Sequence, residues 1–406
     1  MEQKSVSPIK LLLMSSAGMF LDGYQLTVVA LAILIMKPDL HLSDFGASLM
    51  IDSLILGTII GAVSVGYLAD RFGRRRIYMY NLLFFLIFGI ASVATFNFIL
   101  IVVFRVMMGI AVGADYPVSN SYIAEMAPEK LRGKFLSFSS VAFVIGALSS
   151  SLVAALFFYF DFPDSSWRYM VGIGLIPAAI VLILRLSMPE SEKWEKVQRI
   201  RKRGAVREMF RGQSAKFTIL TSVIWFIYDM GAFGIGLLVP SLLQSSNLIG
   251  NYYENAIVTS AFLVIGLISG VIVIMLVDRI GRKSIQMLGF LGMGISLILI
   301  PYTFYTFLIV ILAFAEFSNG WPSATVGIFP AELSSTEFRS SAYGLAATIG
   351  KLGAVAGVLI IGNSINPSSF YIFTIFGLIM FSAIIMTVFL RETGKLKLDE
   401  MFLPEV

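Results

Sequence analysis

Cysteine is absent from this chain of 406 residues, and histidine occurs once, as His41. The absence of cysteine excludes a disulfide framework and any thiolate metal site. A single histidine cannot form the histidine clusters that hold many catalytic metals. Charge is scarce as well, because Asp, Glu, Lys and Arg make up 14% of the residues, whereas soluble domains carry about 25%. The composition therefore argues against a soluble globular protein.

Long runs without a charged residue dominate what is present. Hydrophobic residues make up 57% of the chain, and the longest uncharged runs are 284–315 and 352–390. About 20 apolar residues cross the core of a bilayer, so each of these runs holds two helices. The sequence predicts an all-α membrane protein with twelve transmembrane helices. The predicted spans are residues 11–36, 46–69, 77–96, 98–124, 135–160, 168–187, 217–243, 255–277, 284–302, 305–329, 340–362 and 368–390.

Basic residues gather on one side of the predicted spans. Nine of the 30 Lys and Arg residues lie between Lys193 and Lys216, and others cluster at 70–76, 128–134 and 278–283. If the spans alternate in direction, all of these loops share one side, which the positive-inside rule makes cytoplasmic. The first residues, MEQKSVSPIK, are too polar for a signal peptide. We expect a multi-pass protein of the cell membrane with both termini in the cytoplasm.

The two halves of the chain repeat the same landmarks. The hexapeptide at Asp70–Arg75 returns at Asp278–Lys283. Glu125, Arg132 and Asp22 also return half a chain length later, as Glu332, Arg339 and Asp229. Parallel repeats with a site between them are a transporter architecture. The sequence predicts two pseudo-symmetric six-helix bundles at 1–187 and 217–390, joined by a basic cytoplasmic linker at 188–216 and followed by a cytoplasmic tail at 391–406.

Several of these motifs resemble those of the major facilitator superfamily. The loop GYLADRFGRRR is similar to the signature loop of that superfamily, and the endings PESEKW and RETGKLKLDE resemble those of its sugar porters. FLDGYQ, GADYPVSNSYIAE and WFIYDMGAFGIG resemble the first, fourth and seventh helices of its phosphate:proton symporters. The second loop copy departs from the pattern, because Ile274 stands where the first copy has Gly66. The resemblance covers essentially the whole chain and implies the major facilitator fold.

Ionisable residues inside the predicted spans mark candidate functional positions, because each costs roughly 2.5–3.5 kcal/mol near the bilayer centre. Burial among aromatic rings disfavours the charged form of a carboxylate, so that such a group can exchange protons near neutral pH. We predict Asp22 as the leading proton carrier, with Asp115 and Asp229 as further proton-coupling acids. The alternative for Asp115 is a purely structural ion pair with Arg105 or Lys351. The six ionisable residues within the spans are Asp22, Arg105, Asp115, Asp229, Glu316 and Lys351.

Candidate substrate contacts share helix faces with these acids. A spacing of four residues places Trp225, Asp229 and Phe233 on one face of the seventh span. The resemblance implies that Phe143, Phe233 and Ser323 stand where phosphate symporters have a glutamine, a tyrosine and an asparagine. The predicted substrate-binding residues are Gln25, Tyr116, Phe143, Trp225, Asp229, Phe233, Glu316, Asn319 and Ser323.

The repeated loops are predicted to close the cytoplasmic side. A positive-inside cluster alone would need neither the acid, nor the glycine, nor a second copy. The resemblance implies ion pairs that break and re-form in each cycle, which supplies the bistable element of alternating access. The predicted gating residues are Asp70, Arg71, Arg74, Glu125, Arg132, Asp278, Arg279, Arg282, Glu332 and Arg339.

These observations predict a proton-coupled symporter of a small polar solute. The three replaced polar groups would leave phosphate oxygens without donors, which favours an organic acid or a sugar over inorganic phosphate. Phosphate:proton symport is the alternative within transport, and a transporter-like receptor without transport is the alternative from another class. The chain has no Walker loop and no nucleophile–base constellation, so neither ATP hydrolysis nor another enzyme activity is expected. We expect no cofactor, no nucleic acid, and a monomer whose partners are its solute, protons and the bilayer.

Overall fold

Every regular element in the described part of the chain is a helix. The computed structural model describes residues 8–186, 190, 194, 205–245, 251–303, 305–362 and 371–394. The first half contains α1 (Pro8–Asp39), α2 (Asp44–Phe72), α3 (Arg74–Ala94), α4 (Phe98–Met126), the 3₁₀ turn η1 (Glu129–Leu131), α5 (Arg132–Tyr159), η2 (Asp164–Ser166), α6 (Trp167–Ile173) and α7 (Leu175–Arg185).

The second half repeats this succession of long helices. It contains α9 (Ala205–Glu208), α10 (Gly212–Ser245), α11 (Tyr252–Ile280), α12 (Arg282–Leu299), η3 (Ile300–Tyr302), α13 (Tyr305–Thr325), α14 (Ile328–Glu332), α15 (Arg339–Gly362) and α16 (Tyr371–Val388). Ten segments are long and apolar enough to cross a membrane, and α10 and α15 supply the other two of the twelve predicted helices. The predicted fold class is therefore confirmed.

One predicted span differs in detail from the sequence expectation, and the predicted linker and tail lie largely outside the described residues. The sixth span is not a single helix, because it breaks at Gly174 between α6 and α7. Of the predicted linker 188–216, the described residues are Glu190, Trp194 and those from Ala205 onward, and residues 395–406 of the predicted tail lie outside the described part. The boundaries of the two halves stay predictions at these points.

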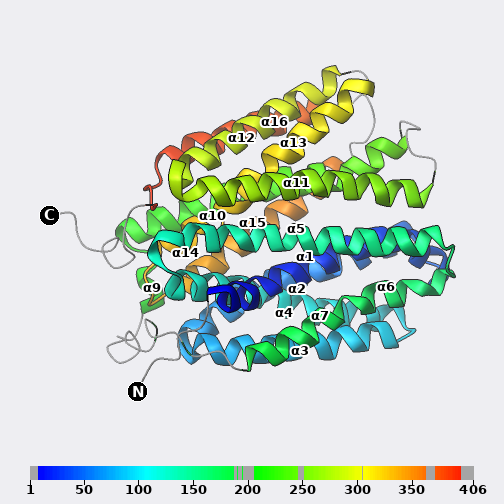
Figure 1. Cartoon of the computed structure of the whole chain (residues 1–406), viewed down its shortest axis with the longest axis horizontal. Coiled ribbons are helices and arrows are strands. Elements are labelled where there is room, and N and C mark those ends of the chain that lie inside the picture. Colours follow the sequence, from blue (N-terminus) through cyan, green and yellow to red (C-terminus); the bar gives the residue numbers. More distant parts are fainter. Residues whose placement is uncertain are drawn as a thin grey trace.

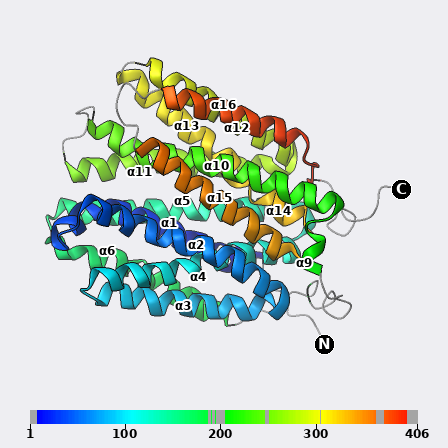
Figure 2. The same cartoon turned by 180° about the vertical axis from the view of Figure 1, so that it is seen from behind.

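Two helix bundles lie side by side, as Figures 1 and 2 show. One bundle holds α1 to α7, coloured blue to green, and the other holds α10 to α16, coloured green to red. Across the boundary α5 packs on α11, and α2 packs on α15. Helix α1 begins and α16 ends at the same end of the molecule, the left-hand end of Figure 1. The space between the bundles is thus bordered by helices of both repeats.

Equivalent glycines turn the chain at equivalent places in the two bundles. Gly73 joins α2 to α3 with φ of 103°, and Gly281 joins α11 to α12 with φ of 100°. Residues other than glycine rarely adopt this backbone conformation, which explains why both loop copies have a glycine here. The repeat read from the sequence is therefore a repeat of backbone geometry as well.

The outer surface of the described helices is apolar. Ile87, Ile180, Leu378 and Ile385 are each more than half exposed, and they lie on three helices, α3, α7 and α16. A soluble protein would hide such side chains, whereas in a bilayer they meet lipid, and the helices satisfy their own backbone groups. The chain is therefore a multi-pass membrane protein whose polar groups are gathered inside.

Candidate functional site

A polar cluster joins the two bundles near the middle of their helices. Tyr116 of α4 donates a hydrogen bond to the carboxylate of Asp22 on α1. In the other bundle, Nζ of Lys351 on α15 lies 3.4 Å from Oδ2 of Asp229 on α10. The same ammonium group lies 5.7 Å from the ring centre of Tyr116 and 4.4 Å from that of Phe233. Lys351 therefore contacts side chains of both bundles, and we call these five residues the central cluster.

Helix geometry explains how α4 and α10 present these groups. Trp225, Asp229 and Phe233 share one face of α10, as their spacing predicts, and the ring of Trp225 meets that of Tyr343 edge-on at 5.3 Å. Within α4, Pro117 has no backbone N–H to donate to the carbonyl oxygen one turn earlier in the same helix. Asn120 binds the carbonyl oxygen of Tyr116 through its side chain at 3.0 Å, which adds a polar contact to this part of the helix. The aromatic and proline residues thus belong to the same polar region as the acids.

Asp115 lies next to the central cluster but has other partners. Its Oδ1 accepts a hydrogen bond from Nη1 of Arg185 at 2.8 Å, and its Oδ2 accepts one from Ser119 at 2.7 Å. The alternative prediction, an ion pair of Asp115 with Arg105 or Lys351, is therefore wrong, because the partner of Asp115 is Arg185. Arg185 escaped notice because it stands at the end of the sixth span, where a basic residue is expected to reach the membrane surface.

Arg105 has a separate set of contacts in the first bundle. Its Nε donates to the carbonyl oxygen of Met50 at 3.3 Å and to Oγ of Ser53 at 3.1 Å. Both acceptors lie on α2. Arg105 therefore ties α4 to α2 and is not placed with the acids of the central cluster.

A second polar group lies in the other bundle, on α10 and α13. Tyr228 donates to Oδ1 of Asn319 at 3.0 Å, and Asn319 donates to Oε2 of Glu316 at 3.4 Å. Among the described residues, Glu316 forms no ion pair. The backbone oxygen of Ser323 accepts a hydrogen bond from Ser140 of α5 at 2.7 Å, which links this helix to the first bundle. The predicted polar face of the tenth span is thus present, and Tyr228 is a member that the sequence interpretation did not single out.

Two predicted substrate residues lie at the border of the site. Gln25 donates from its side chain to the carbonyl oxygen of Val171 on α6 at 3.3 Å, so its amide is directed away from the central cluster. Phe143 lies on α5 where that helix meets α1, and its backbone is directly beneath Gly23. A side chain at Gly23 would collide with this backbone, so the two helices approach closely here.

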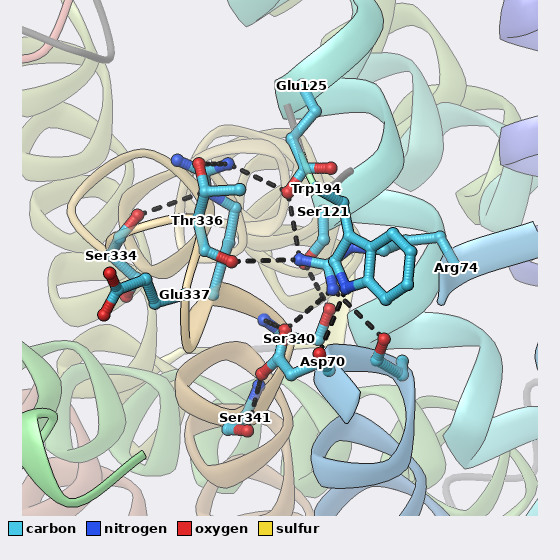
Figure 3. A network of polar contacts seen from close by, with 12 residues as sticks. Asp70, Arg74, Ser121, Glu125, Trp194, Ser334, Thr336, Glu337, Ser340 and Ser341 are labelled. Atoms are coloured by element: carbon cyan, nitrogen blue, oxygen red, sulfur yellow. Dashed lines mark hydrogen bonds and ion pairs between the residues drawn. The ribbon is translucent and has the colours of Figure 1, made fainter. Parts of the chain in front are cut away.

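The predicted gating residues form a buried network at the end of the molecule where α1 begins (Figure 3). Arg74 binds Asp70 at 2.9 Å and Glu125 at 3.0 Å, and Glu125 also binds Arg339 of the other bundle at 3.1 Å. The carboxylate of Asp70 accepts hydrogen bonds from α15, at 3.2 Å from the Ser340 backbone and at 2.7 and 2.6 Å from the backbone and hydroxyl of Ser341. These bonds cross between the bundles and hold this end closed.

The second loop copy forms a matching but weaker arrangement. Arg282 binds Asp278 at 2.9 Å, and Arg132 of the first bundle binds Glu332 at 2.7 Å. Asp278 accepts a bond across the boundary from the backbone of Lys134 at 3.2 Å. We call the two copies together the latch; it comprises Asp70, Arg74, Glu125, Arg132, Asp278, Arg282, Glu332, Arg339, Ser340 and Ser341.

Arg71 and Arg279, which were also predicted to gate, are exposed on the outside of this network. Arg71 stacks on the ring of Phe72 at 5.4 Å. Consecutive residues of a helix point in different directions, so the residue that follows an inward-facing aspartate points outward. Each of these arginines therefore faces solvent or lipid headgroups. The structure therefore does not bring these two arginines together with the other gating residues.

Two acids that the sequence interpretation left out complete the latch end. Glu190 accepts a bond from the backbone N–H of Arg74 at 3.1 Å, and Glu392 accepts one from the backbone N–H of Arg282 at 3.1 Å. Each carboxylate therefore caps the start of a helix whose preceding glycine has no side chain to do so. The two acids lie in the segments PESEKW and RETGKLKLDE. The resemblance of these segments to sugar-porter endings did not indicate that their acids cap helices.

Comparisons with known proteins agree with the fold. The family model described as Sugar (and other) transporter matches residues 11–215, and the one described as Major Facilitator Superfamily matches residues 221–401. The putative metabolite transport protein YaaU of Escherichia coli is 26% identical over 96% of this chain and 94% of its own. A repressible high-affinity phosphate permease of Neurospora crassa is 26% identical over 97% of this chain and 86% of its own. The solved structure of the proton:xylose symporter XylE bound to 6-bromo-6-deoxy-D-glucose is similar in fold, with a TM-score of 0.81 at 24% identity over 97% of this chain and 98% of that one.

Proposed function

The chain belongs to the major facilitator superfamily, and from that premise we propose that it is a proton-coupled symporter of a small organic acid or sugar. As a member of this superfamily it is a membrane transporter and not an enzyme. The proposal adds the coupling ion, the class of solute and the residues that handle each. The observation that carries it is the central cluster, where an aspartate without a cationic contact faces an aspartate that has one.

Asp22 is the proposed proton carrier. Its carboxylate is fully buried, and its one hydrogen bond among the described residues comes from the neutral Tyr116. A buried carboxylate without a cation in direct contact is costly when charged, so its protonation state depends on the charges that come to lie beside it. Tyr116 lies between Asp22 and Lys351 and therefore connects the proton site to the other bundle. Asp115, which already binds Arg185, is the second proposed acid of the coupling pathway.

Lys351 and Asp229 are the proposed centre of solute binding. Lys351 is the one described cation that contacts the central cluster, and it rests on the aromatic faces of Tyr116 and Phe233. A solute carboxylate can replace Asp229 as the partner of Lys351, and protonation of the aspartate would then offset the charge that enters. The rings of Phe143 and Phe233 provide apolar surface for an organic body. Lys351 thus favours an organic acid over a neutral sugar.

Alternating access supplies the proposed cycle. The latch crosses between the bundles and is formed in this structure, so the cycle must break it to open that end. The positive-inside rule assigns the latch end to the cytoplasm, because the basic loops lie there. Binding of proton and solute would draw the bundles together on the far side, after which release of the latch opens the cytoplasmic side. The proposed energy source is the proton gradient, and the proposed unit is the monomer in its bilayer.

Transport into proteoliposomes tests the proposal. Under an imposed inward proton gradient, the parent protein should accumulate one of a panel of labelled short organic acids or sugars, and dissipating the gradient should stop accumulation. Asp22→Asn should abolish gradient-driven accumulation while leaving solute exchange partly intact. Lys37→Gln, a charge change at an exposed position outside the cavity, is the matched control and should behave as the parent. Undiminished accumulation by Asp22→Asn would remove Asp22 from the mechanism.

Inorganic phosphate is the second candidate solute. Asp115 with Tyr116, and Trp225 with Asp229, resemble the pairs of phosphate symporters, and the phosphate permease is among the relatives. Robust proton-driven phosphate uptake at micromolar concentration, unaffected by competing organic acids and sugars, would restore that assignment. Binding of a solute with no movement of it, in the same vesicles, would favour a receptor.

A further inference from the structure

A groove opens on the outside of the first bundle, at the end opposite the latch. Its volume is about 850 Å³, within the range of roughly 300–1,000 Å³ that ligand sites occupy. The ends of α3 and α5 and the start of α6 and α7 line it, with most of its lining side chains apolar. The groove is on the membrane-facing side of α6 and is separate from the central cluster, so solute transport does not account for it.

Arg168 stands at the polar end of this groove. Its guanidinium lies between two aromatic rings, at 4.3 Å from the ring centre of Phe96 and 4.3 Å from that of Trp167. Nη1 donates to the backbone oxygens of Val93 at 2.8 Å and of Thr95 at 2.6 Å, at the end of α3. Arginine has five N–H donors, so Nε and Nη2 keep three that are not used in these bonds.

The charge of Arg168 is unusual for its location and is not neutralised by contact. The sequence places few basic residues at this end of the spans, and Arg168 and Lys37 are the ones that stand out there. The acid that interacts electrostatically with Arg168 is Asp39. Its carboxylate accepts a hydrogen bond from Trp167 at 2.7 Å and forms no ion pair with Arg168. The three unused N–H donors of Arg168, held between two aromatic rings, can donate hydrogen bonds to the oxygens of a phosphate group.

The rest of the groove suits an acyl chain. From Arg168 the wall continues along Gly172 and Ile173, about one turn further toward the middle of the membrane, and then along Ile176, about one turn beyond these. A Cβ at Gly172 would meet no atom within 4 Å, so the glycine leaves open space in the wall and no part of the protein fills it. Tyr169 is 70% exposed beside Arg168, as expected of an aromatic residue at the membrane border.

We propose that this groove binds a phospholipid, with its phosphate on Arg168 and one acyl chain along Gly172, Ile173 and Ile176. The apolar wall leading away from the arginine is what commits the site to a lipid: a free phosphate would use the donors and leave that wall in contact with nothing specific. The bound lipid would stabilise the junction of α6 and α7, since its headgroup contacts α6 and its chain contacts both helices.

Lipid titration followed by native mass spectrometry tests this proposal on the full chain in detergent. Phosphatidylglycerol should bind the parent protein with one site of higher affinity. Arg168→Gln should weaken that site roughly tenfold or more, because it removes hydrogen bonds to a charged group. Gly172→Leu should weaken it similarly by filling the wall, whereas Lys37→Gln should bind as the parent does. Dioleoylglycerol, which lacks the phosphate, and inorganic phosphate, which lacks the chains, should each fail to compete at the same concentration.

Two results would overturn the proposal. Equal phosphatidylglycerol binding by the parent, Arg168→Gln and Gly172→Leu would show that the groove holds only exchangeable boundary lipid. Competition by inorganic phosphate as effective as that by phosphatidylglycerol would show an anion site without a lipid chain. Thermal unfolding of lipid-free samples, expected to be unchanged in Gly172→Leu because its new side chain meets open space, separates loss of binding from loss of fold.

Discussion

Asp70→Asn is the sharpest perturbation of the latch, because one carboxylate carries three bonds between the bundles. Hydrogen bonds to charged groups contribute about 1.5–3 kcal/mol each, against about 1 kcal/mol for neutral ones. Asparagine keeps one acceptor for the backbone of α15 and presents an NH₂ group to the remaining donors. The ion pair of Asp70 with Arg74 lies within one bundle and is present whether the latch is open or closed, so its loss largely cancels between the two states. We expect the closed state to lose about 3 kcal/mol relative to the open one, a shift of roughly a hundredfold.

The absence of cysteine makes this shift measurable by single-site labelling. Ser121 is fully buried and its hydroxyl bonds to that of Ser340 across the boundary at 3.0 Å, so Ser121→Cys reports separation of the bundles. A membrane-impermeant maleimide applied from the latch side should label this cysteine much faster when Asp70→Asn is also present. Ser165→Cys, exposed in η2 at the opposite end, serves as the reference when the same reagent is applied from that side, and it should label at the same rate in both backgrounds.

Asp278→Asn is the matched control from the second loop copy. Asp278 accepts a single described bond across the boundary, from Lys134, and its side chain is 12% exposed. Its replacement should therefore raise the labelling of Ser121→Cys about tenfold at most. An unchanged labelling rate in Asp70→Asn, or an equal rise in both asparagine variants, would show that the bonds of Asp70 to α15 do not hold the latch closed.

Two further variants test the proposed solute site. Glu316→Leu removes the acceptor of the Asn319 amide, so that Asn319, to which Tyr228 donates, is no longer held in place. It should raise KM for the transported solute roughly tenfold while kcat changes less, as measured by initial uptake rates; an unchanged KM would take the α13 group out of the solute site. Phe143→Gln combined with Phe233→Tyr adds two hydrogen-bonding groups, so inhibition of uptake by inorganic phosphate should strengthen roughly tenfold or more. If phosphate inhibits the double variant no better than the parent, those two positions do not explain solute choice.

The sequence predicted the membrane fold because the bilayer imposes a pattern that a single chain displays. Helices must be long, apolar and mostly uncharged to satisfy their own backbone in lipid, so the spans appear as uncharged runs. The latch was predictable for a related reason, since its acids and arginines are repeated in both halves at equal spacing. Asp70 with Arg74 and Asp278 with Arg282 form the expected pairs, four residues apart across the glycine turn that separates two helices.

Partners that depend on neighbouring helices were not predictable in the same way. Asp115 of α4 binds Arg185 at the end of α7, and nothing in the spacing of the two residues along the chain indicates that contact. Ser340 and Ser341 bind Asp70 through backbone groups, which carry no sequence signal of their own. Gln25 donates to the backbone of Val171 on α6, a partner that hydropathy does not reveal.

The repeat also explains why two equivalent aspartates can have different roles. Asp22 and Asp229 occupy matching positions of α1 and α10, yet the partner of Asp22 is the hydroxyl of Tyr116 and that of Asp229 is the ammonium of Lys351. A carboxylate beside a cation is stabilised in its charged form, whereas one beside a neutral donor in an apolar bundle is stabilised far less. The two proposed roles follow from this difference: Asp229, beside a cation, is the proposed solute-binding acid, and Asp22, beside a neutral donor, is the proposed proton carrier at the equivalent place in the other bundle. Because Lys351 also touches Tyr116, a solute that draws Lys351 away from Asp229 changes the surroundings of Asp22. That shared contact is the physical route by which solute binding in one bundle can be coupled to proton binding in the other.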